Sequence, residues 1–290
     1  MNTVWSDYVQ GTGTLYSSRI LRFHDRFAAQ YQSFFGLDPA ARLRILEVGC
    51  GPGALAGALH RWYPNAEITA LDRDSTFIAF AKEHEPGIVF SEGDATALPF
   101  ADATFDVTVS NTVSEHVEPS LFFGEQYRVL KPGGVCLVLS SRKGIRVLPD
   151  CLQAGEREQA FWEKVSRYDH TTEEYSVCRY PMNEAQLPAA MEAYGFRSVS
   201  TGYATVNLTP DDPAVPASMA HDMINADRQS ELEAIASVRR TMPEYVGAEE
   251  AEEMERLTNE KYDRRIQAYD SGEKYWDTGV SVIMMIRGIR

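Results

Sequence analysis

The segment Ile45-Leu46-Glu47-Val48-Gly49-Cys50-Gly51-Pro52-Gly53-Ala54 decides the fold class. An apolar stretch interrupted only by an acidic residue runs into a turn that contains three glycines, and a helical pattern continues to Trp62. Glycine is needed where a turn is tight and a side chain would keep a ligand from the backbone. The following helix offers free N–H groups and the positive end of its dipole. The segment therefore predicts a strand, a ligand-binding turn and a helix.

Strand and helix patterns alternate on both sides of this turn. Apolar strands are predicted at 43–48, 67–71, 88–91, 105–110 and 135–140, and helices at 75–84, with Ser75 as N-cap, and 121–130. Such alternation favours parallel pairing in an α/β doubly wound sheet. Further on, helices are predicted at 156–168 and 183–194, the latter ended by Gly195, and strands at 196–206 and 279–286. The opening residues 4–35 have the pattern of one or two helices.

Composition limits the partners and the location. The 290 residues carry a formal net charge of -14, which makes nucleic acid and anionic membranes poor partners. The four cysteines show neither CxxC spacing nor a zinc pattern. Apolar runs are too short to cross a bilayer, and no signal-peptide pattern opens the chain. We therefore expect a cytoplasmic protein with a small-molecule partner.

The glycine turn alone leaves the ligand open. Gly49 to Ala54 also satisfies the dinucleotide fingerprint G-x-G-x-x-G/A, and Asp72 would hold ribose hydroxyls in either case. Two acidic residues favour a sulfonium nucleoside. Glu47 suits the ammonium group of a methionine-like ligand and would repel a pyrophosphate. Asp94, in Gly93-Asp94-Ala95 after the third strand, can accept a hydrogen bond from an adenine amino group.

With Phe105-Asp106-Val107 and Leu130-Lys131-Pro132-Gly133-Gly134 added, the chain resembles the class I S-adenosylmethionine-dependent methyltransferases, particularly the small-molecule enzymes of the ubiquinone-biosynthesis type. The resemblance is strong over residues 42–141 and looser over 183–206 and 279–286. It implies a Rossmann-like, seven-stranded sheet with an antiparallel last strand. It also implies S-adenosylmethionine as cofactor and in-line methyl transfer to a nitrogen, oxygen or sulfur atom, giving S-adenosylhomocysteine.

The resemblance assigns cofactor roles by position. The methionine moiety would be surrounded by residues of the first turn: Glu47, Gly49, Cys50, Gly51 and Gly53. Asp72, at the end of the second strand, would hold the ribose, and Arg73, Asp94 and Ala95 would bind the adenine. Asn111 and Thr112, at the end of the fourth strand, would lie beneath the sulfonium.

His116, beside Glu115, is the best candidate for a general base if the acceptor is a hydroxyl group. Some relatives hold magnesium with a Glu-x-x-Glu-His pattern, but Thr112 replaces the first glutamate here, so we predict no metal. The alternative, that Glu115 and His116 only cap a turn and contact the cofactor, stays open.

The acceptor site is expected in the variable parts of the chain. We interpret residues 1–36 as a helical lid and 37–290 as the methyltransferase domain, with insertions at about 142–182 and 207–276. Aromatic faces in the lid would stabilise a cationic product, and arginines would hold a substrate carboxylate. The candidates are Tyr8, Tyr16, Arg19 and Arg22; the alternative is a helix that merely packs on the sheet.

Three other functions are compatible with the same scaffold or the same cofactor residues. An aminopropyl transferase or an NAD-dependent oxidoreductase uses the same scaffold, and the Tyr-x-x-x-Lys match of the latter, Tyr127 to Lys131, falls too early in the chain. A binding protein that has lost catalysis would also keep the cofactor residues. The insertion before the last strand predicts either a lid or an oligomer interface, so a homo-oligomer stays open.

Overall fold

The computed structural model describes residues 4–169, 174–175 and 177–290, so residues 1–3 of the predicted lid and 170–173 and 176 of the first predicted insertion lie outside it. One seven-stranded sheet forms the centre, in the order β3-β2-β1-β4-β5-β7-β6. The strands are β1 (Arg44–Val48), β2 (Glu67–Asp72), β3 (Val89–Glu92), β4 (Phe105–Asn111), β5 (Leu130–Val147), β6 (Arg197–Leu208) and β7 (Thr278–Ile289).

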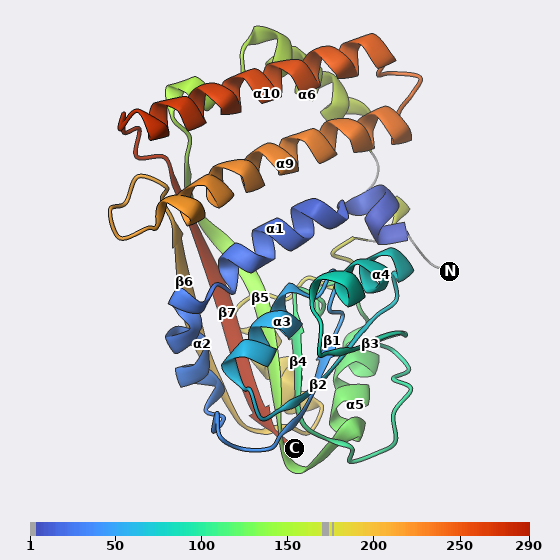
Figure 1. Ribbon diagram of the computed structural model, residues 1–290. Coiled ribbons are helices and arrows are strands. Elements are labelled where there is room, and N and C mark those ends of the chain that lie inside the picture. The colour runs from blue at the N-terminus through green and yellow to red at the C-terminus, as the bar shows by residue number, and fades with distance from the viewer. Residues whose placement is uncertain (1–3, 170–173, 176) are drawn as a thin grey trace.

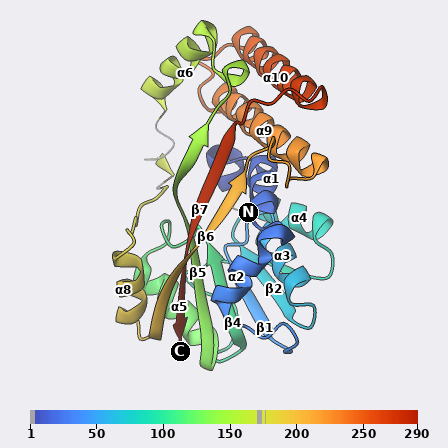
Figure 2. The ribbon, with the colours of Figure 1, turned by 90° about the vertical axis from the view of Figure 1, so that its left-hand side faces the viewer.

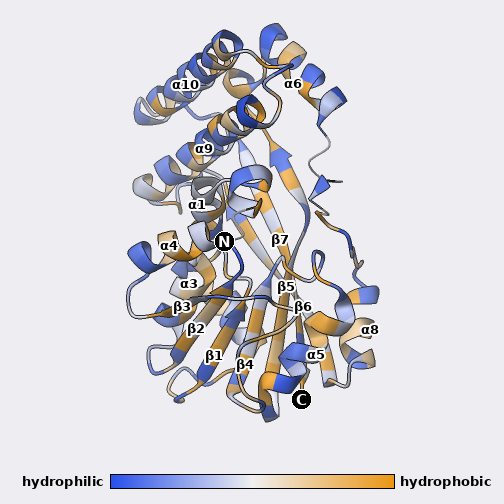
Figure 3. Ribbon diagram, turned by 90° about the vertical axis from the view of Figure 1, so that its right-hand side faces the viewer, coloured by the Kyte–Doolittle hydropathy of each residue, from blue (hydrophilic) through white to orange (hydrophobic). Residues whose placement is uncertain are grey.

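The strand directions confirm the predicted fold class. Strands β1 to β5 pair in parallel, whereas β7 runs antiparallel to both β5 and β6. The central strands are buried on both faces, which explains the near-continuous apolar runs in the sequence. Figure 3 shows this apolar sheet between more polar helices.

Helices cover both faces of the sheet. One face carries α2 (Ala28–Phe35), α3 (Ala54–Trp62) and α4 (Ser75–His84), whose apolar side chains share one core with Ile45, Val107 and Leu137. The other face carries α5 (Pro119–Val129) and α8 (Gln186–Ala193), which pack on Cys136 and Val138. Alternate residues of β5 thus point to opposite faces, as the two-residue repeat of a strand requires.

Two local predictions were wrong. The N-cap of α4 is Asp74, not Ser75: its Oδ1 atom accepts hydrogen bonds from the N–H groups of Thr76 and Phe77 at 3.0 and 3.4 Å. Strand β5 extends far beyond the predicted 135–140 because β7 supplies a pairing partner as far as Val147. Gly195, by contrast, follows α8 with φ +97°, as expected after a helix end.

Beyond its predicted end, β5 contains one extra residue relative to β7. Arg142 pairs with Val282, but Ile145, three residues on, pairs with Val280, only two residues away. Gly144 lies in this bulge, where a Cβ atom would come within 1.8 Å of the Val280 carbonyl oxygen.

Three helices form a cap above the carboxyl ends of the parallel strands (Figure 1). This helical cap consists of α6 (Glu156–Tyr168), α9 (Ala217–Thr241) and α10 (Ala248–Asp270); a single turn, η3 (Asp150–Leu152), precedes α6. Lys261 on α10 joins them, with Nζ 2.8 Å from Glu158 on α6 and 2.6 Å from Glu231 on α9. In the described ranges no helix has the length and apolarity that crossing a membrane needs.

The N-terminal helices lie against the sheet and the cap. A short turn, η1 (Trp5–Val9), leads into α1 (Thr12–Arg22), which packs between α9 and α3, and a further turn, η2 (Asp25–Phe27), leads into α2. Figure 2 shows β5, β6 and β7 extending beyond the other strands of the sheet toward the cap. Helix α1 therefore lies where the cap meets the sheet.

A buried ion cluster fastens the cap to β7. The fully buried Arg265 of α10 places Nη2 3.0 Å from Asp211 and 2.6 Å from Asp277, which precedes β7. Asp211 also accepts hydrogen bonds from the N–H groups of Tyr275 and Trp276 at 2.9 and 2.8 Å. Removing one member would leave a buried charge without compensation.

We predict that Asp211→Ala lowers the free energy of unfolding by about 3–5 kcal/mol, because it breaks a buried ion pair. Glu260→Ala, which breaks the exposed pair with Arg256, is the control and should cost less than about 1 kcal/mol. Urea denaturation measures both. Equal losses in the two variants would contradict the anchoring role of Asp211.

Candidate active site

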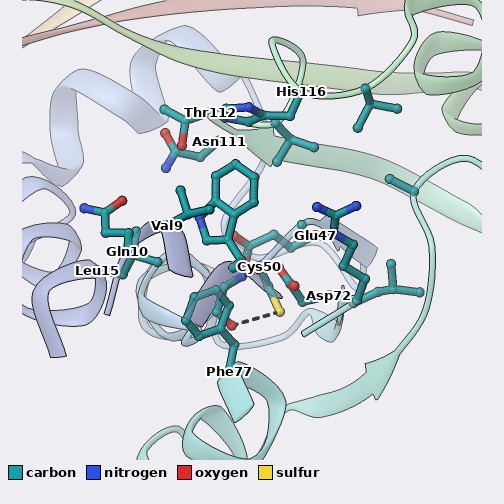
Figure 4. Close-up of a pocket in the computed structure, with 18 of the residues that line it drawn as sticks. Val9, Gln10, Leu15, Glu47, Cys50, Asp72, Phe77, Asn111, Thr112 and His116 are labelled. Carbon is teal, nitrogen blue, oxygen red and sulfur yellow. Dashed lines mark hydrogen bonds between the residues drawn. The ribbon is translucent and has the colours of Figure 1, made fainter. Parts of the chain in front are cut away.

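A cavity of about 550 Å³ opens at the carboxyl ends of β1, β2 and β4, below η1 and α1. Its size suits a nucleoside-sized ligand. Figure 4 shows Glu47, Asp72, Asn111 and His116 around it. The structure brings ten of the eleven predicted cofactor residues to its wall: Glu47, Gly49, Cys50, Gly51, Asp72, Arg73, Asp94, Ala95, Asn111 and Thr112.

The glycine turn shows why Gly53 is the exception. Gly51 has φ +53° and no atom within 4 Å of an added Cβ, so its bare backbone faces the cavity. Gly53 has φ +92°, and an added Cβ would meet Ala81 at 3.0 Å and Phe90 at 3.1 Å. Gly53 therefore allows α3 to start close to its neighbours and does not line the cavity, contrary to the position expected for it.

A buried and a half-buried carboxyl group, those of Glu47 and Asp72, form the floor. Glu47 is 1% exposed, and its Oε2 atom has no hydrogen-bond partner among the described residues. Burial, and then the nearby Asp72, raise the pKa of Glu47 well above its usual value. Burial also raises the pKa of Asp72, although its carboxylate accepts hydrogen bonds from the N–H groups of Gly51 at 2.8 Å and Asp74 at 2.9 Å. This floor lacks positive charge and favours a cationic ligand.

The remaining polar groups lie along the rim. The Asp94 side chain stabilises the turn in which it lies, since its Oδ1 atom accepts hydrogen bonds from the N–H and hydroxyl groups of Thr96 at 2.8 and 2.7 Å. Asn111 has a buried Oδ1 without a partner in the described chain. Thr112 takes φ +55°, a strained conformation for a β-branched residue, and its N–H donates to Leu139 O at 2.8 Å. Such strain often marks functional positions.

The environment of His116 favours a hydrogen-bond donor over a base. Its Nδ1 atom accepts from the N–H of Cys178 at 3.0 Å, so the neutral ring carries its proton on Nε2. Burial lowers the pKa of His116, which favours this neutral form. With Nδ1 occupied and Nε2 protonated, the ring has no free lone pair for the base role expected from the sequence.

Glu115 lies outside the cavity wall. Its carboxylate accepts from the Ser114 hydroxyl at 3.2 Å, and its carbonyl accepts from the Tyr180 N–H at 2.9 Å. These contacts join the loop after β4 to residues 177–180, which also border the cavity. Glu115 is thus placed to shape this loop.

Trp5 closes the cavity and was missed as a site residue. Its ring lies edge-on to His116 at 4.6 Å between centroids and faces the Arg73 guanidinium at 5.9 Å. The N–H of Ser6 donates to Asp74 at 2.8 Å and holds η1 in place. The aromatic character of residues 4–35 was the only sequence signal, and it did not single out Trp5.

The four predicted acceptor residues separate in space. Arg19 lines the first cavity, whereas Arg22 lines a second cavity of about 420 Å³ between α1, α9 and β5 to β7. Tyr8 lies outside both walls and stacks on Tyr175, which lines the first cavity. Tyr16 lines neither cavity, and its hydroxyl donates to Glu85, at the C-terminal end of α4, at 2.9 Å.

The sheet order, the glycine turn and the acidic floor define a doubly wound nucleoside-binding protein. Residues 46–138 match the family model described as a methyltransferase domain. Over these residues the chain is therefore similar to methyltransferases.

Curated relatives match part of the chain. A fatty-acid O-methyltransferase of Mycolicibacterium smegmatis is 43% identical over 34% of this chain and 37% of its own length. A malonyl-[acyl-carrier protein] O-methyltransferase of Erwinia pyrifoliae is 30% identical over 60% of this chain and 59% of its own length. The chain thus spans less than two thirds of either relative.

A solved structure supports the fold over nearly the whole chain. Phosphoethanolamine N-methyltransferase 2 of Haemonchus contortus, solved with S-adenosyl-L-methionine, aligns with a TM-score of 0.52. The alignment covers 99% of this chain and 59% of that protein at 17% identity. At this identity the likeness concerns the fold alone.

We predict that His116 stays neutral with its proton on Nε2 near neutral pH, and that its titration midpoint lies below the ordinary value of about 6.5. The unfolded chain binds this proton more readily than the folded protein does. The contribution of His116 therefore lowers the free energy of unfolding as the pH falls below about 6.5. Nitrogen-detected NMR gives the tautomer and the midpoint, and His116→Gln removes this part of the pH dependence. A proton on Nδ1 or a raised midpoint would contradict the assignment.

Proposed function

We propose that this protein transfers the sulfonium methyl group of S-adenosylmethionine to a small-molecule acceptor and releases S-adenosylhomocysteine. The observation that carries the proposal is the buried Glu47 oxygen without a partner, beside Asp72, in a cavity of nucleoside size. An uncompensated carboxylate in a low-dielectric site strongly favours a bound cation. The relatives' names agree on methyl transfer and differ in the acceptor.

The residues present fit this cofactor. Glu47 would receive the ammonium group of its methionine part, and Asp72, at the end of the next strand, would accept from the ribose hydroxyls. Asp94 and Ala95 would border the adenine, with Arg73 beside it. The bare backbone of Gly51 leaves room for close approach. Asn111 and Thr112 would lie beneath the sulfonium.

When bound, S-adenosylmethionine supplies a methyl carbon that is already activated for displacement. The chain's main task is therefore alignment of the acceptor with that carbon, which can supply much of the rate enhancement. Trp5 and residues of α1 line the cavity. Arg19 donates to the Thr112 hydroxyl at 3.0 Å and so holds a positive charge next to the reaction centre.

Acid–base chemistry plays a smaller part in this proposal. His116, as an Nε2–H donor, would orient the acceptor or its own loop and would not remove a proton. An acceptor that is already a nucleophile at neutral pH, such as an anion or a neutral amine, needs no base. The site geometry favours that group of acceptors over unactivated hydroxyls.

The dehydrogenase alternative fits less well. A pyrophosphate across the turn would face the acidic floor of Glu47 and Asp72, which repels it. Tyr127 lies in the other core, packed on Phe196 and the Arg290 guanidinium, and does not line the cavity. A proton relay from this tyrosine would therefore have no path to the cofactor.

We predict that S-adenosylmethionine and S-adenosylhomocysteine both raise the melting temperature and that NAD does not. Glu47→Gln and Asp72→Asn should each weaken S-adenosylmethionine binding by about 1.5–3 kcal/mol, because a charged hydrogen-bond acceptor is lost. Isothermal calorimetry measures the affinities.

Glu67→Gln is the matched control, since Glu67 opens β2 at its exposed end and should leave binding unchanged. Tighter binding of NAD than of either sulfur nucleoside, or unchanged affinity in both acidic variants, would overturn the proposed function.

A further inference from the structure

Arg19 and Arg22 lie three residues apart on the same face of α1 and reach Thr112, just after β4, and Ser141, within β5. The guanidinium of Arg19 donates to the Thr112 hydroxyl at 3.0 Å, and that of Arg22 donates to the Ser141 hydroxyl at 3.1 Å. Neither has a carboxylate oxygen within 4.0 Å in the described part of the chain. Both guanidinium groups therefore donate hydrogen bonds to neutral hydroxyl groups.

Several other arginines of this protein have a carboxylate partner. Arg265 is held between two aspartates, and Arg128 pairs with Glu125 at 2.7 Å and Asp102 at 2.9 Å. Arg146, which also lines the second cavity, pairs with Asp227 at 3.0 Å. The two arginines of α1 lack such a partner, and both line a cavity.

The charge on these two groups is poorly compensated. Burial, followed by repulsion from Arg22, lowers the pKa of Arg19, while Glu115 and Glu47 oppose this from beyond ion-pair distance. Burial likewise lowers the pKa of Arg22. An arginine keeps its charge in a protein, so this imbalance persists until an anion approaches.

The second cavity gives such an anion a place. It lies between α1, α9 and the upper parts of β5 to β7, and Gln10 borders both cavities. Its wall carries the hydroxyl groups of Ser18, Ser141 and Ser281 and the apolar side chains of Leu21, Met223 and Ile224. Two carboxylates also line it, and each is paired with an arginine: Asp227 with Arg146 and Asp277 with Arg265. The methyl-donor site and this cavity thus meet at α1.

We propose that the methyl acceptor is a small organic oxyanion, a carboxylate or a phosphate, whose charged group lies between Arg19 and Arg22 and whose body occupies the second cavity. Guanidinium groups bind both kinds of oxyanion through paired N–H donors. This inference rests on the proposed function, since the first cavity must hold the methyl donor.

The first test needs no knowledge of the acceptor. Arg22→Met should raise the melting temperature of the free protein by about 2–4 °C, because a poorly compensated charge is replaced by an apolar chain. Arg128→Met, at a fully paired arginine, should lower it. An Arg22→Met variant that is destabilised like Arg128→Met would assign Arg22 a structural role and overturn the proposal.

The second test uses phenylacetate and phenyl phosphate as probes, with neutral phenylacetamide as their match, titrated by calorimetry in the presence of S-adenosylhomocysteine. We expect at least one anion to bind at least about ten-fold more tightly than the amide, and that preference to be lost in Arg22→Met. The stronger anion identifies the oxyanion. Arg256→Met, at an exposed arginine of α10, should keep the preference.

Equal binding of the amide, no binding of either anion, or an unchanged preference in Arg22→Met would each overturn the proposal. The Arg22→Met protein should keep its affinity for S-adenosylhomocysteine. Failure of the unaltered protein to bind S-adenosylhomocysteine would instead count against the proposed function, so the two failures are distinguishable.

Discussion

The constraint on which this site depends is a pair of carboxyl groups at the ends of adjacent parallel strands, one of them buried and the other half-buried. Burial of a charge is costly unless it is paired, and neither Glu47 nor Asp72 has a cationic side chain within ion-pair distance in the described chain. The parallel register of β1 and β2 places them together, since Glu47 and Val48 lie opposite Ala70 and Leu71, just before Asp72. The sheet thus provides a negative floor that only a positively charged ligand completes.

Helix α1 gives the site its second half. The floor of the first cavity is acidic, whereas the face of α1 above it carries Arg19 and Arg22. A methyl donor with a sulfonium group and an acceptor with an anionic group would therefore be drawn to opposite walls. This ordering by charge favours one arrangement of the two reactants, which is what an in-line transfer requires.

The sequence predicts those parts of the molecule that depend on local pattern. Strands, the glycine turn and the acidic residues at strand ends follow from apolar runs and from spacing, and most of the predicted cofactor residues line one cavity. Contacts between distant segments were not predictable. Trp5 reaches His116 across more than a hundred residues, and the tautomer of His116 depends on the Cys178 N–H. The choice of Asp74 over Ser75 as the cap is local, and both residue types suit that position. Tyr16 was misplaced because helical spacing alone does not say which neighbour a face meets.

The bulge at Gly144 has an effect on solvation at the seam between cap and sheet. One additional residue inverts the alternation of β5, so Arg146 faces α9 and pairs with Asp227, whereas Ile145 and Val147 turn outward and are 60% and 55% exposed. An uninterrupted strand would have turned those two apolar side chains toward α9 and filled the gap with hydrocarbon. The inversion instead keeps the polar Arg146 side chain between β5 and α9. A polar solute can therefore exchange there without the cap having to separate from the sheet.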